Sequence, residues 1–88
     1  MVYNKPTLIS TQTTTTIAAT GGGVIHTINI HITTTGTVTF QSTAATPVVY
    51  FVLPVATVAN SYLLDVVFGN GLAVVTSAAD NLMVTTGQ

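Results

Sequence analysis

The segment Gly23 to Thr33, GVIHTINIHIT, has the most regular alternation of side chains in the chain. Strand side chains point alternately to opposite faces, so residues two apart share a face. One predicted face carries Val24, His26, Ile28, Ile30 and Ile32, and the other carries Ile25, Thr27, Asn29, His31 and Thr33. A period of two does not fit a helix, so this segment predicts a half-buried β-strand.

Short strand-like segments recur along the rest of the chain. In residues 37–41 the alternation places Val38 and Phe40 inward, whereas VVYFVL, residues 48–53, is apolar on both faces and predicts a covered central strand or an interface strand. After a loop, a further strand is expected to begin near Tyr62. Seven to eight short strands, about 8 to 12 residues apart, predict an all-β fold, a small antiparallel β-sandwich or jelly-roll-like barrel.

The whole chain, residues 1–88, is short enough to form one domain. Its first 20 residues are rich in threonine and have a poor core pattern, so we expect an extended N-terminal arm there. The arm could pair with a partner by strand addition over residues 6–17.

Gly69-Asn70-Gly71 lies between two apolar segments. A dinucleotide-binding loop needs a further glycine at the position of Val74 and a helix after it. Neither requirement is met. An Asn-Gly pair between strands instead predicts a β-hairpin, with both Asn70 and Gly71 at positive φ.

Charged residues make up 3% of the chain, and the formal net charge is −1. A single Lys or Arg cannot neutralise a phosphate backbone, which argues against nucleic-acid binding.

No apolar segment reaches the roughly 18 to 20 residues of a membrane-spanning helix, and the N-terminus lacks the apolar core of a secretion signal. About a fifth of the residues are threonine, so the surface depends on hydroxyl groups for solubility. Such a surface is tolerable if subunits cover much of it, which favours a homo-oligomer.

The residues that could carry chemistry are few. His26 and His31 are five positions apart and fall on opposite faces of one strand, so they cannot bind one metal ion within a chain. Asp65 and Asp80 are isolated from each other in the sequence. We therefore expect no metal, no cofactor and no enzymatic activity. His26 is expected to be mostly buried with a hydrogen-bond partner, and His31 to lie at the surface or at an interface, where a symmetric oligomer could bring several copies together.

Aggregation-prone segments such as residues 48–53 are safest when a neighbour covers them. Tyr50 and Phe51 are therefore candidate interface residues, with a purely core role as the alternative. The other interface candidates are His31 and, in the Thr-rich segment, Thr13, Thr15 and Ile17.

Two motifs resemble those of the small all-β virion proteins of tailed bacteriophages. The first is a Gly-Val-(Leu/Ile)-His-x-Ile opening strand, matched by Gly23, Val24, Ile25, His26 and Ile28. The second is an Asp-Val-x-Phe-x-Asn-Gly-Leu-x-Val-Val-Thr segment, matched by Asp65, Val66, Phe68, Asn70, Gly71, Leu72, Val74, Val75 and Thr76.

This resemblance implies a virion structural protein, located in particles assembled in the host cytoplasm. The expected role is a capsid decoration (cement) protein that binds the major capsid protein, or other virion proteins, as a homo-oligomer, with a trimer favoured. Alternatives are a head-fibre, neck or tail component, or a carbohydrate- or surface-binding β-module. Sugar sites usually stack an aromatic platform, and this chain has no Trp and only three Tyr and three Phe.

Overall fold

The computed structural model describes residues 4–87, which form eight β-strands and no helix. The all-β expectation is therefore confirmed. The strands are β1 (Asn4–Ile9), β2 (Thr14–Ala18), β3 (Gly23–Ile30), β4 (Val38–Gln41), β5 (Val49–Leu53), β6 (Asn60–Phe68), β7 (Leu72–Thr76) and β8 (Leu82–Gly87).

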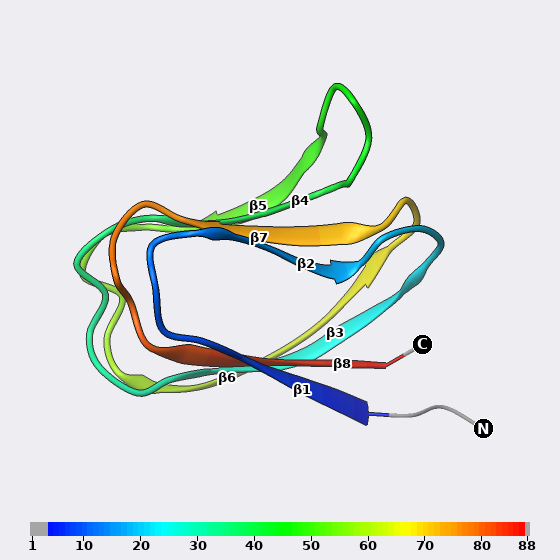
Figure 1. Ribbon diagram of the computed structural model, residues 1–88. Helices are drawn as coiled ribbons and strands as arrows, with labels where there is room; N and C mark the ends of the chain where they lie inside the picture. Colours follow the sequence, from blue (N-terminus) through cyan, green and yellow to red (C-terminus); the bar gives the residue numbers. More distant parts are fainter. Residues whose placement is uncertain (1–3, 88) are drawn as a thin grey trace.

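The strands form two four-stranded sheets, with orders β1-β8-β3-β6 and β2-β7-β4-β5, and every pairing is antiparallel. Figure 1 shows the sheets as two stacked layers. Consecutive strands lie in opposite sheets except β4 and β5, which pair as a hairpin. Eight strands wound between two sheets in this way form a jelly roll.

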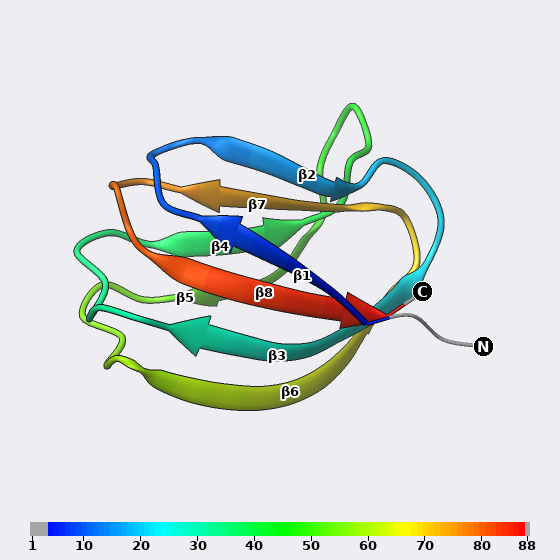
Figure 2. The same ribbon diagram turned by 60° about the horizontal axis from the view of Figure 1, so that its bottom comes forward.

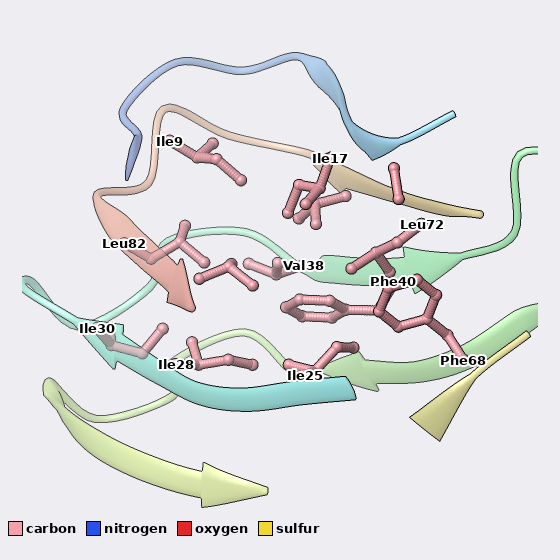
Figure 3. Packing of buried hydrophobic residues seen from close by; sticks show 13 residues of the cluster. Ile9, Ile17, Ile25, Ile28, Ile30, Val38, Phe40, Phe68, Leu72 and Leu82 are labelled. Atoms are coloured by element: carbon pink, nitrogen blue, oxygen red, sulfur yellow. The ribbon is translucent and has the colours of Figure 1, made fainter. Parts of the chain in front are cut away.

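The core lies between the two sheets, where inward side chains from both layers meet (Figure 3). Val38 and Phe40 are fully buried, as their alternation predicts. Burial of one such large side chain contributes about 1.5 to 3 kcal/mol. The cluster comprises Ile9, Ile17, Ala18, Ile25, Ile28, Ile30, Val38, Phe40, Phe68, Leu72, Val74, Leu82 and Val84.

A β-bulge in β3 changes the predicted faces of that strand. The register with both neighbouring strands shifts between Ile25 and Thr27. An irregularity of this kind reverses the alternation beyond it, so Ile25 is buried together with Ile28. The prediction that Val24 and His26 share one face with Ile28 and Ile30 is therefore wrong, and Val24 and His26 are both only half-buried. Ile32 lies beyond the end of β3 and is 64% exposed.

Residues 4–18 of the expected N-terminal arm form β1 and β2, which pair with β8 and β7 of the same chain. Their side chains Ile9 and Ile17 belong to the core. Both partners lie more than 50 residues away in sequence, so local patterning does not reveal the pairing. Residues 1–3 of the expected arm lie outside the described residues.

The expected hairpin at Asn70-Gly71 is wrong. β6 and β7 belong to different sheets, so this turn carries the chain from one layer to the other. Gly71 has a positive φ of 71°, but Asn70 does not, whereas a type I′ hairpin turn needs both. Gly71 N donates to Gly21 O at 2.7 Å, and a Cβ at Gly71 would lie 2.9 Å from Ala18 O. The glycine therefore permits close packing of two sheet-crossing loops.

Candidate interaction surface

The sandwich is open along one side. β5 and β6 are edge strands of different sheets, and they lie on the same side of the molecule without pairing to each other (Figure 2). Residues 49–53 of this segment therefore form the edge strand β5, and the expectation of a covered central strand is wrong. Six apolar side chains that pack against the core from this side are only partly buried: Tyr50, Phe51, Leu53, Tyr62, Leu64 and Val66.

Two aromatic residues anchor β5 to the core. The ring of Phe51 stacks on Phe40, with centroids 4.3 Å apart and an interplanar angle of 15°. The Tyr50 hydroxyl donates a hydrogen bond to Gly71 O at 2.9 Å, and its ring lies 6.4 Å from that of Phe68. Both side chains therefore contact the core while part of each faces solvent. This position is compatible with the interface role and with the core role expected for them.

Most of the exposed apolar side chains lie in the segment that contains β5 and β6. Nine large hydrophobic residues are exposed among residues 4–87, and only Leu8 and Ile32 lie outside the segment 48–67. Leu63 and Val67, on the outer face of β6, are 74% and 73% exposed. We call the exposed residues of this segment, together with the six partly buried ones, the β5–β6 side. Its exposed members are Val48, Val49, Val52, Val55, Val58, Leu63 and Val67.

Charge is sparse on this surface. Asp65 projects from β6, with 62% of its side chain exposed, and its Oδ1 lies 3.1 Å from Nδ1 of His26. The backbone of Asp65 has a φ of 51°, a left-handed conformation that Asp tolerates better than most residues. His26 thus has the hydrogen-bond partner expected of it, but its side chain is 32% exposed rather than mostly buried. Many exposed apolar side chains with little charge are typical of a protein–protein interface.

The Thr-rich interface candidates lie on the opposite side of the sandwich, at and beside the edge strand β2. Ile17 is buried and Thr15 is half-buried, so neither offers a free surface. Thr13 is exposed, but its backbone N–H and C=O both bond to Thr76. The structure therefore brings Tyr50 and Phe51 together but separates them from these three residues.

His31 is exposed just after the end of β3, as expected for a surface residue. Its Nδ1 lies 2.7 Å from Asn81 Oδ1, and its backbone N donates to Asn81 O at 3.0 Å. His31 thus joins the loop after β3 to the loop before β8. It lies outside the β5–β6 side.

Sequence reasoning missed Leu63 and Val67. The signal that could have found them is the composition of YLLDVVF, which is apolar on both faces, as in residues 48–53. Within the described residues, no three His, Cys, Asp or Glu side chains gather as a metal site. Residues 4–87 also include no helix long and apolar enough to span a membrane.

Comparison with known proteins gives a match in fold only. No family model and no curated protein matches the sequence. Among solved structures, the chain is similar to the NLP-core of Drosophila, with a TM-score of 0.63 and 11% identity over 100% of this chain and 96% of that one. The crystal structure of NLP-core provides insight into pentamer formation and histone binding.

This comparison corrects the function expected from the bacteriophage resemblance. A solved structure that matches over the full length of the chain is a Drosophila protein whose structure is connected with pentamer formation and histone binding, not with a capsid. The assignment as a capsid decoration protein, or as another virion component, is therefore wrong. The phage motifs coincide with β3 and with the segment that runs from β6 through the sheet-crossing turn into β7. At this level of identity the comparison establishes the jelly-roll fold.

Proposed function

We propose that this protein is a non-enzymatic assembly module that functions as a homo-oligomer, with the β5–β6 side of each subunit covered by its neighbour. The single observation that carries the proposal is the open side of the sandwich. Apolar residues that pack against the core, such as Phe51 and Leu64, remain partly exposed there, and seven exposed apolar side chains lie in the same segment, residues 48–67.

The energetics favour burial of the whole side rather than of one residue. Association costs about 4 to 15 kcal/mol in lost translational and rotational freedom. Full burial of one Leu or Val side chain contributes about 1.5 to 3 kcal/mol. Several exposed side chains of the β5–β6 side must therefore be covered together. The scarcity of charge on this side lowers the desolvation cost of doing so.

For the stoichiometry, the similarity to NLP-core favours a pentamer over the trimer expected from the sequence. A ring of five subunits requires a heterologous contact, in which the β5–β6 side packs against a different surface of the neighbour. A two-fold dimer would instead place two β5–β6 sides against each other.

The histone binding of NLP-core does not carry over to this chain. Recognition of a strongly basic partner depends on a surface of opposite charge. This chain has two acidic residues, and Asp80 is 4% exposed. Asp65 therefore provides the exposed carboxylate, and it is paired with His26. We propose self-association as the function and no basic partner.

The proposal is tested by measuring mass in solution by light scattering and sedimentation velocity. Val67→Glu places a charge on a side chain that is 73% exposed, so the subunit fold should tolerate it. We expect the wild-type protein to be a homo-oligomer and the variant to dissociate at least tenfold more readily. Ile32→Glu is the matched control, because Ile32 is 64% exposed and lies outside the β5–β6 side.

Two results would contradict the proposal. One is a wild-type protein that remains monomeric at concentrations of about 100 μM. The other is equal dissociation by Val67→Glu and Ile32→Glu, which would place the contact elsewhere. Circular dichroism of each variant checks that the subunit remains folded.

A further inference from the structure

The turn Gly69-Asn70-Gly71 lies at one end of the sandwich, next to the loop that leads from β2 to β3 (Figure 1). Asn70 is exposed, and its side-chain amide bonds to no other described residue. It is the only asparagine of the chain that is followed by glycine, and Gly71 has no side chain to shield its backbone nitrogen. In an Asn-Gly pair this nitrogen can attack the side-chain carbonyl carbon of the asparagine. The turn therefore carries both reacting groups of a spontaneous intrachain deamidation.

The folded protein restrains the nucleophile. Gly71 is buried, and its N–H donates to Gly21 O at 2.7 Å. The carbonyl oxygen of Asn70 accepts from Thr43 N at 3.2 Å, so the peptide group that joins Asn70 to Gly71 is bonded at both its oxygen and its nitrogen. The next carbonyl oxygen, Gly71 O, accepts from the Tyr50 hydroxyl at 2.9 Å. Ring closure needs the Gly71 nitrogen without its proton, and a buried, bonded proton is not available to hydroxide.

We propose that Asn70 is a deamidation site and that local opening of this turn controls its reaction. Loops open by local unfolding at a lower free energy than that of global unfolding. In the open turn, hydroxide removes the Gly71 amide proton and the nitrogen attacks Asn70 Cγ. The side-chain NH₂ group leaves as ammonia with a proton from water, and a cyclic imide forms. Water then opens either C–N bond of the ring to give isoaspartate or aspartate, and each product has one more negative charge than asparagine.

The isoaspartate product does not fit the native turn. Its backbone runs through Cβ and Cγ of residue 70, which lengthens the chain before Gly71 by one methylene group. The former carbonyl group of residue 70, which accepts from Thr43 N, becomes a free carboxylate. Gly71 lies where even a Cβ would approach Ala18 O to 2.9 Å, so the site has little room for the extra length. Formation of isoaspartate therefore makes the opening of this crossing permanent.

The test is peptide mass spectrometry of the full chain after incubation at mildly alkaline pH, with fragmentation that distinguishes isoaspartate from aspartate. One sample is folded and the other is unfolded in guanidinium chloride. We expect Asn70 to convert faster than any other asparagine, and roughly 10- to 100-fold faster in the unfolded sample, because several hydrogen bonds of the turn are open there. Equal rates in the two samples would overturn the proposal. So would conversion in the unfolded chain that is spread evenly over its asparagines.

Two tyrosine variants test the control by local opening, which depends on contacts within one chain. Tyr50→Phe removes the bond to Gly71 O, and it should speed the conversion of Asn70 roughly three- to tenfold in the folded protein but not in guanidinium chloride. Tyr62→Phe is the matched control, because its hydroxyl donates to Val58 O at 2.7 Å, away from the turn. Both tyrosines belong to the β5–β6 side, so any effect of self-association falls on both variants. Equal rates in the two folded variants would overturn the proposal.

The isolated isoaspartate form tests the consequence for the fold. Its urea midpoint should be roughly 1 M or more below that of freshly purified Asn70→Asp, which carries the same charge on an unaltered backbone. Equal midpoints would mean that the crossing closes again after the reaction, and would overturn the inference that the opening is permanent.

Discussion

Thr76→Val tests how the loop between β1 and β2 is held to the sandwich. Thr76 is 3% exposed, and its hydroxyl oxygen accepts from Thr13 N at 3.0 Å while its hydrogen points to Thr11 O at 2.7 Å. Valine has nearly the same shape but can make neither bond. The backbone bond from Thr76 N to Thr13 O, at 2.9 Å, remains in the variant.

The expected cost follows from these contacts. Two hydrogen bonds contribute about 1 kcal/mol each to stability. The added methyl group of valine is buried and returns roughly 0.8 kcal/mol. We therefore expect the free energy of unfolding to fall by about 1 to 2 kcal/mol. At a urea m-value of about 1 kcal/mol per M, the midpoint should move down by roughly 1 to 2 M.

The assay is urea unfolding at one fixed protein concentration, which holds any contribution of self-association constant. Thr39→Val is the matched control. Thr39 lies on the outer face of β4, and its hydroxyl bonds to no other described residue, so we expect a change within about 0.5 kcal/mol. Equal effects of the two substitutions would refute the reasoning. So would an unchanged rate of hydrogen exchange at the Thr13 amide.

Two further substitutions test the backbone of the loops. Gly71→Ala should lower the free energy of unfolding by more than about 1 kcal/mol, because φ is 71° and the new Cβ would meet Ala18 O at 2.9 Å. Gly69→Ala is the control, because a Cβ there meets nothing within 4 Å, and it should change the urea midpoint little. Equal urea midpoints for the two variants would contradict this account. Ala56→Gly should be neutral or stabilise by up to about 1 kcal/mol in thermal unfolding, since Ala56 has a φ of 66° that glycine adopts without strain. A clear loss of stability would contradict that account.

Part of the candidate surface could be predicted from the sequence. The apolar composition of residues 48–53 singled out Tyr50 and Phe51, and both lie on the open side. The pairing of β5 with only one neighbour, and the alignment of its free edge with that of β6, could not be predicted. Edge positions depend on which distant strands pair, and local alternation carries no information on this.

The burial of Asp80 could not be predicted either. In the sequence Asp80 is one isolated acid in a turn. Its burial arises because the loop after β3, some 45 residues earlier, folds over it and supplies the Thr35 donors. Contacts between loops at the same end of a sandwich follow from the winding of the chain between sheets.

The sequence by itself determined the all-β class, the approximate number of strands and much of the core. Side-chain alternation and the strand preference of β-branched residues depend on residues that are close together in the sequence. Only the tertiary structure decided which strands share a sheet. It turned the expected hairpin at Asn70-Gly71 into a crossing between layers, and it made β1 and β2 edge strands of the two sheets. It also introduced the bulge that buries Ile25 with Ile28. Strand pairing and register are set by contacts between residues far apart in the chain, and these contacts form only when both sheets close over one core.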